Sequence, residues 1–140
     1  MLKTTRTRTS LVALTTAIVC AGLAGCGGSK GPDRHRVWGK VTFHGQPVPV
    51  GSIKFDPDGS QGNQGPQGFA TIKDGHYDTA GAGAGVVGGP HVVRISGFDG
   101  IASSDDAPQG APLFPAYQTT VDLPKEPAEK DFEIPGPAAR

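Results

Sequence analysis

The apolar residues of this chain fall into short runs that alternate with polar residues, and glycine and proline separate the runs. From Val37 to Phe43, and again from Ile53 to Phe55, every second residue is small or apolar. Alternation with a period of two is typical of a strand with one buried face. Among the 140 residues are 22 glycines and 13 prolines, and after residue 26 no window of eleven residues shows helical spacing free of them. The pattern predicts an all-β chain, with at most one helical turn at 126–130.

About seven short strands are expected, separated by turn signals. Lys73-Asp74-Gly75 is typical of a tight hairpin, and His44-Gly45-Gln46-Pro47 supplies another turn. Short strands at such spacing favour a sandwich of two antiparallel sheets. The predicted strands cover residues 37–43, 53–55, 69–72, 76–77, 91–96, 119–123 and 131–134, and the last two are expected to pair.

The first 25 residues have the composition of an export signal. Lys3, Arg6 and Arg8 give a positive start without any acidic residue, and residues 11–23 are mostly apolar. The apolar stretch is shorter than the roughly 20 residues that a membrane-spanning helix needs. We therefore expect residues 1–25 to be a signal peptide.

The signal ends in Leu23-Ala24-Gly25-Cys26, which resembles the lipobox of bacterial lipoproteins. The resemblance implies cleavage before Cys26 and a diacylglyceryl thioether on its sulfur, which would hold the exported protein on a membrane facing the periplasm or the cell surface. An ordinary signal peptide with a free Cys26 thiol, or modification at Cys20, remains the alternative. Residues 26–36 are expected to be a polar tether.

Charge and cysteine content exclude several classes of function. All 13 acidic residues follow residue 25, whereas three of the 13 basic residues precede it, so the rest of the chain has three more acidic than basic residues. Nucleic-acid binding needs a basic face and is not expected. Cys26 is the only cysteine after the signal, which excludes an internal disulfide, a cysteine nucleophile and a thiolate metal site.

The order of residues also resembles a known family. The run Val37-x-Gly39-x-Val41-x-Phe43-x-Gly45-x-Pro47-Val48-x-x-Gly51-x-Ile53-x-Phe55 is similar to the opening of carboxypeptidase-regulatory-like domains, in the version found as small bacterial lipoproteins. The segments 74–77, 89–95 and 114–117 resemble the middle and end of that family. The resemblance implies a transthyretin-like, immunoglobulin-like β-sandwich over 37–134, a tail at 135–140, and no catalytic residues. The glycine-rich segment 81–89 departs from the family pattern, so its conformation stays open.

Two loops carry motifs of ligand-binding proteins. Residues 83–88 match a dinucleotide fingerprint, but Gly89-Pro90 and a strand follow where the motif needs a helix N-terminus, so we expect a loop. Asp56-x-Asp58-Gly59 is similar to the start of a calcium loop, but residues 61–68 add no carboxylate. Turn-forming aspartates are the expected interpretation unless the fold brings Asp99, Asp105 and Asp106 close.

Isolated histidines and serines indicate no active site. His44, His76 and His91 lack the spacing of metal ligands, and no serine stands in a nucleophile-elbow motif. We therefore expect no metal, no cofactor and no enzyme activity.

Trp38 is the residue most suited to contact a ligand. If Val37, Gly39 and Val41 face the core, then Trp38, Lys40 and His44 share the opposite face of the strand. An exposed tryptophan beside hydrogen-bonding side chains can stack on a sugar ring or on a partner's apolar patch. Alternatively, Trp38 covers the edge of the sandwich or contacts the tether.

Together these observations predict a lipid-anchored accessory protein of the cell envelope. Its expected role is that of a non-catalytic structural or protein-interaction module, for which an exposed sheet edge is a natural docking site. A carbohydrate-binding module that uses the face around Trp38 is the alternative.

Overall fold

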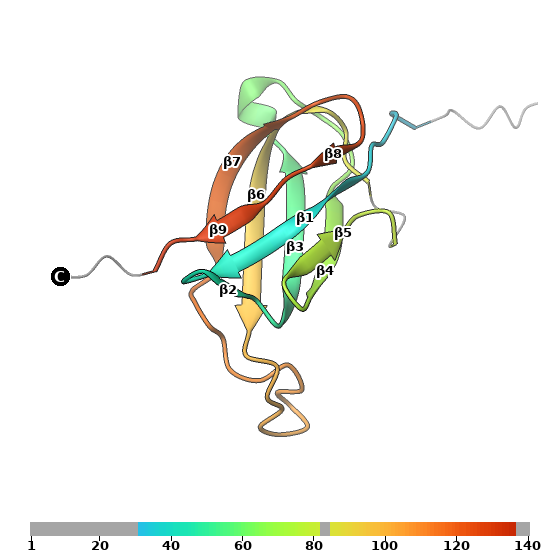
Figure 1. Ribbon diagram of the computed structural model, residues 1–140. Helices are drawn as coiled ribbons and strands as arrows, with labels where there is room; N and C mark the ends of the chain where they lie inside the picture. Colours follow the sequence, from blue (N-terminus) through green and yellow to red (C-terminus); the bar gives the residue numbers. More distant parts are fainter. Residues whose placement is uncertain (1–30, 82–84, 137–140) are drawn as a thin grey trace, which may run out of the picture. The chain divides into compact units, whose positions relative to one another are not determined.

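The computed structural model describes residues 31–81 and 85–136, and this part of the chain is all-β (Figure 1). The predicted signal peptide, residues 1–25, and Cys26 lie outside these ranges. No helix in these ranges is long and apolar enough to cross a membrane. One 3₁₀ turn, η2, spans Gly59–Gln61. The strands are β1 (Val37–Phe43), β2 (Gln46–Pro47), β3 (Val50–Pro57), β4 (Gly68–Lys73), β5 (His76–Asp78), β6 (Gly89–Phe98), β7 (Tyr117–Leu123), β8 (Ala128–Glu129) and β9 (Phe132–Ile134).

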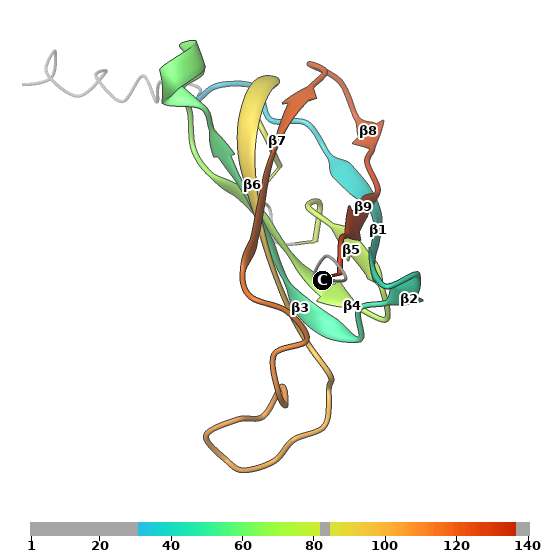
Figure 2. The same ribbon diagram turned by 90° about the vertical axis from the view of Figure 1, so that its left-hand side faces the viewer.

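The strands form one continuous sheet that curls into two layers. The hydrogen-bonded order is β2-β1-β5-β4-β3-β6-β7, and β8 and β9 both pair with β1. Figure 2 shows β1, β8 and β9 on one side of the domain and β3, β6 and β7 on the other. The all-β, sandwich-like fold predicted from the alternation is therefore confirmed, with one curled sheet in place of two separate ones.

The pairing of the last two strands differs from the prediction. β9 pairs in parallel with β1, with Val41 opposite Phe132 and Phe43 opposite Ile134. β7 pairs antiparallel with β6 instead. Residues 126–130 contain the short strand β8 and no helical turn. The chain between β7 and β9 crosses from one layer to the other, which explains why two consecutive strands do not pair.

The alternating residues fill the core as expected. Val37, Gly39 and Val41 are buried on β1, whereas Lys40 between them is exposed. The buried side chains of β3 and β6 are fully covered, since Ile53, Phe55, Val93 and Ile95 have no exposed area. The rings of Phe55, Tyr77 and Phe132 lie 5.9–6.3 Å apart between centroids and join the two layers. The rest of the core cluster is Val37, Val41, Val48, Ala70, Ile72, Val86, Phe114, Leu123 and Ile134.

Two tight turns join the strands of the β4–β5 and β1–β2 hairpins. Asp74 and Gly75, between β4 and β5, have φ angles of 50° and 76°. His44 and Gly45, between β1 and β2, have φ angles of 51° and 73°. Positive φ at both central residues defines the type I′ turn, whose twist matches that of antiparallel strands.

The folded unit extends into the segment that was expected to be a tether. His35 and Val86 form an antiparallel bridge, with N–H···O distances of 2.7 and 2.9 Å. The Arg34 guanidinium donates to the carbonyl groups of Gly85 and Gln67. Within the glycine-rich segment, Val86 has no exposed area and Val87 has 6%. The described part of this segment is thus held in place by main-chain pairing and by burial of two valines.

Candidate functional site

Trp38 lies on the wall of an open depression where the sheet curls from β1 through β5 to β4. The depression has a volume of about 730 Å³. Trp38 is half-buried there, and Lys40, the second predicted contact residue, is exposed beside it. The other side chains that define it are Thr71, Lys73, Asp74, His76, Tyr77, Asp78 and Glu129.

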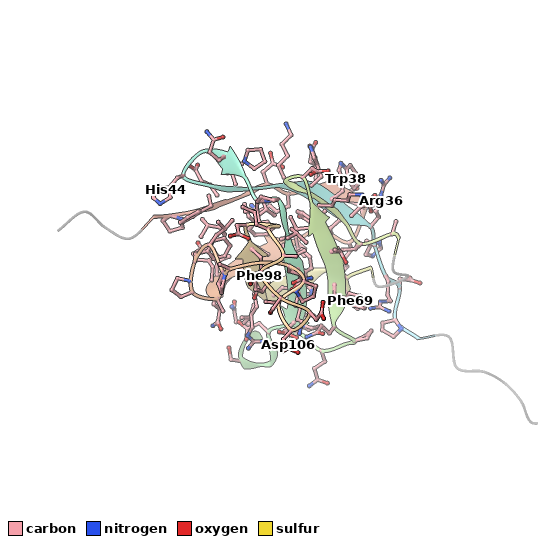
Figure 3. The ribbon with its side chains drawn as sticks, turned by 90° about the horizontal axis from the view of Figure 1, so that it is seen from below. Arg36, Trp38, His44, Phe69, Phe98 and Asp106 are labelled. Atoms are coloured by element: carbon pink, nitrogen blue, oxygen red, sulfur yellow. The ribbon has the colours of Figure 1, made fainter. Side chains whose placement is uncertain are left out.

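The face of the Trp38 ring is partly occupied by Arg36. The guanidinium carbon lies 4.8 Å from the ring centroid, which is a cation–π geometry. Asp78 holds the guanidinium in place with a contact of 2.5 Å between Nη2 and Oδ2. Figure 3 shows Arg36 and Trp38 side by side. A sugar that stacks on this ring must use the remaining surface or displace Arg36.

One ion pair and one buried hydroxyl group fix the electrostatics of the depression: Arg36 with Asp78, and Tyr77. The hydrogen bond from Arg36, helped by the N–H of Ala80, lowers the pKa of Asp78. Burial raises the pKa of Tyr77, whose hydroxyl group donates to the Lys130 carbonyl at 2.6 Å and therefore stays protonated. Among the described residues, the arrangement offers hydrogen-bond donors and acceptors but no unpaired buried acid or base.

His44, the third predicted contact residue, lies away from this depression. It occupies the turn after β1, and Figure 3 places it across the molecule from Trp38. Its ring lies 4.2 Å from that of Phe43. The structure thus brings Trp38 and Lys40 together and places His44 at a second site, because a type I′ turn takes the residue out of the strand.

The aspartates of the calcium-like sequence have a local structural role. Asp58 Oδ1 accepts from the N–H of Ser60 at 3.0 Å, and Oδ2 accepts from Gln61 at 2.8 Å, so Asp58 caps η2. The bonds from Ser60 and Gln61 lower the pKa of Asp58. Asp56 pairs with Arg94. Within 31–81 and 85–136, no three His, Cys, Asp or Glu residues gather as metal ligands.

The remaining histidines, the serines and the glycine motif form no recognisable site in the described chain. His76 is exposed on β5. His91 is fully buried, and its Nδ1 contacts the Gly89 carbonyl at 2.8 Å, whereas its Nε2 has no hydrogen-bond partner among the described residues. No serine hydroxyl bonds a histidine there. Residues 82–84 lie outside the described ranges, and the strand β6 follows the motif at Gly89.

A second feature, which the alternation did not predict, is the incomplete cover over one side of the core. The half-buried apolar side chains that pack against the core are Phe43, Leu113, Tyr117 and Val121. Phe43 ends β1, beside β9. The other three lie on β7 or just before it. Half-buried apolar residues therefore gather on the open side between β7, the last strand of one layer, and β9, which lies in the opposite layer.

A groove of about 650 Å³ lies on this open side. Its lining contains no Asp, Glu, Lys or Arg. The side chains that define it are Phe43, His44, Leu113, Phe114, Pro115, Tyr117, Gln118, Ile134 and Pro135. The apolar run at 113–117 was the sequence signal for this groove, but only the fold shows that Phe43 and Ile134 complete it.

Strand β7 forms the long free edge of the described sheet. It has seven residues and pairs on one side only, with β6. None of its main-chain groups makes a further backbone hydrogen bond in the described chain. By contrast, the corresponding edge of β1 is filled by β8, β9 and the Asp131 carboxylate, which accepts from the N–H of Lys40 at 2.7 Å.

Comparison with known proteins leaves the family open. No protein-family model matches the chain, and no curated protein matches it either.

Proposed function

We propose that this chain is a lipid-anchored accessory protein of the cell envelope that acts by binding another protein. The anchor is the lipid expected on Cys26, and the binding surface is the open side of the sandwich at β7. The proposal treats the domain as a non-catalytic interaction module of the carboxypeptidase-regulatory-like, transthyretin-like kind that the sequence resembles.

The observation that carries the proposal is the contrast between β1, which is paired on both sides, and β7, which is paired on one side only in the described chain. Hydrogen-bonding groups on β1 are used by β8, β9 and Asp131, whereas β7 keeps one side unpaired. Long exposed edges usually carry a lysine, a proline or a bulge that prevents association. Of these, β7 has neither lysine nor proline, and its single charged residue is Asp122. An edge of this length with a single charged residue and no proline is the kind of surface that adds a strand from a partner.

The anchor is tested by substitution of Cys26. Cys26→Ser should move the protein from the membrane fraction to the soluble fraction and remove the mass of the diacylglyceryl group from the intact protein. Cys20→Ser is the matched control and should change neither. A diacylglyceryl mass on the Cys26→Ser protein, or none on the unaltered protein, would contradict lipid anchoring at this residue.

The binding surface is tested by a pair of lysine substitutions on neighbouring residues of β7. Thr119 is half-buried and points inward, whereas Thr120 is exposed on the outer face. After cross-linking in intact envelopes, Thr119→Lys should lose a protein partner that Thr120→Lys keeps, since both variants add the same charge. A partner retained by both variants, or none in the unaltered protein, would contradict docking at β7.

Carbohydrate binding at the Trp38 depression is the second candidate function. The depression favours it because an aromatic ring lies beside the exposed donors and acceptors of Lys40, His76 and Glu129. Sugar sites combine these elements, with the ring stacking on the sugar and polar groups fixing its orientation.

Trp38 is the only tryptophan in the chain, so its fluorescence reports on this site alone. Binding of cell-wall oligosaccharides should change the emission and retain the protein on a polysaccharide column, and Trp38→Ala should abolish retention. Arg36→Ala uncovers the ring and should strengthen retention. An unchanged spectrum at millimolar oligosaccharide would exclude this candidate.

A further inference from the structure

We infer that the open side of the sandwich binds an extended peptide segment that carries large apolar side chains and basic residues. The inference rests on the proposed function and names the chemistry of the partner. Three features of the described structure carry it: the unpaired main chain of β7, the half-covered side chains beneath it, and the sign of the charges on the bordering strands.

The main chain of β7 calls for a partner that is itself an extended polypeptide. In an antiparallel pair, alternate residues direct their N–H and C=O groups to the partner strand, and the others direct them away. Because β7 pairs only with β6, about half of its main-chain groups face outward without a partner in the described chain. Only another backbone presents donors and acceptors at the matching spacing along seven residues.

The inward face of β7 calls for apolar side chains on that segment. On β6, Val93 and Ile95 have no exposed area. On β7 the inward residues Tyr117, Thr119 and Val121 are only half-buried. A strand beside β7 would cover this row, and one of its inward side chains would enter the groove between Tyr117 and Ile134.

The charges on the bordering strands favour a basic segment. The charged residues of β7 and β9 are Asp122 and Glu133, and both are exposed. The groove itself has no charged lining residue. Glu133 lies beside the groove, close to Tyr117 at the start of β7, and Asp122 lies toward the other end of β7, opposite Pro90. A segment along β7 therefore meets an acidic position near each end, which favours apolar residues in its middle and lysine or arginine near its ends.

The probe is a capped heptapeptide that alternates leucine with threonine and carries a lysine at each end. Binding is followed by amide chemical shifts of the full-length chain in detergent micelles. We expect saturable shifts in β7, at Phe43 and at Ile134, and little change at Trp38. Replacing both lysines of the peptide by glutamate should weaken binding at least about threefold at low salt.

Two N-methylated versions of the peptide test main-chain pairing without altering the protein. Each carries methyl groups on alternate residues and so blocks one of the two edges of the peptide strand. One version should bind like the parent and the other at least about tenfold more weakly. Thr119→Lys should abolish binding and Thr120→Lys should retain it, with the amide spectrum of each variant confirming the fold.

Several results would overturn the inference. Equal binding of both N-methylated peptides would exclude strand addition, and stronger binding of the glutamate peptide would reverse the charge assignment. Concentration-dependent self-association that protects β7 would identify a second copy as the occupant. If β7 variants lose the envelope partner but the peptides do not bind, the proposed function stands and the peptide chemistry fails.

Discussion

At the scale of single residues, Gly39 allows the segment between β8 and β9 to approach β1 closely. It lies on the buried face of β1, and a Cβ atom there would overlap the main-chain carbonyl group of Lys130. Lys130 in turn donates its N–H to the Trp38 carbonyl at 2.8 Å. The missing side chain therefore lets the segment between β8 and β9 pair with β1, beside Tyr77.

Gly39→Ala should destabilise the domain because a backbone carbonyl cannot rotate away as a side chain can. We expect a loss of about 1–3 kcal/mol in the free energy of unfolding, measured by urea denaturation. Gly59→Ala is the matched control, since a Cβ there meets nothing within 4 Å, and it should change stability by less than about 0.5 kcal/mol. Equal stability of the two variants would contradict the close approach at Gly39.

Two aspartates should make the stability depend on pH in the acid range. Hydrogen bonds lower the pKa values of Asp58 and Asp78 in the folded protein below the ordinary value of 3.8. Their stabilising effect is therefore complete above that value and is lost as the pH falls through the lowered folded values. The urea midpoint should fall between pH 5 and 2, and less steeply in an Asp58→Asn, Asp78→Asn double variant than in an Asp106→Asn control. Identical pH profiles would contradict these contacts.

At the scale of elements, the sequence predicted the strands better than their partners. Alternation located β1, β3, β4 and β6, because burial of one face leaves a period of two. It could not show that β9 pairs with β1 in parallel, since both strands satisfy the same local pattern whichever neighbour they have. Pairing depends on contacts about 90 residues apart, which no local window contains.

The sequence likewise predicted only part of the candidate site. Trp38 and Lys40 share a face because two residues of one strand keep their alternation. His44 does not join them because the turn begins there, a signal that His44-Gly45 already carried. The sequence did not predict that Val86 and Val87 are buried, because the surrounding glycines indicate a loop. The two adjacent valines were the signal for burial.

The bridge between His35 and Val86 ties the start of the described chain to the glycine-rich segment. His35→Pro removes the N–H that donates to the Val86 carbonyl at 2.7 Å and should cost about 0.5–1.5 kcal/mol. The Val86 amide should then exchange with solvent faster than in the unaltered protein, as hydrogen exchange would show. His35→Ala is the matched control, because it keeps the N–H. Equal exchange of the Val86 amide in both variants would contradict the bridge.

At the scale of the whole domain, the sandwich is closed on one side and open on the other. The β4–β5 hairpin carries the sheet continuously from one layer to the next, and no strand plays that part between β7 and β9 in the described chain. The core is fully buried near the closed side and half-covered near the open one. The described sheet therefore encloses a core and still has an edge available for a partner strand.

Hydrogen exchange along β7 tests the open edge most directly. If β7 pairs only with β6, the amides of Tyr117–Leu123 should alternate between slow exchange for N–H groups bonded to β6 and fast exchange for those that face solvent. The central strand β6, paired on both sides, should be protected at successive residues. Uniform slow exchange along β7 in the isolated protein would mean that its outer edge is already paired, and would contradict the account.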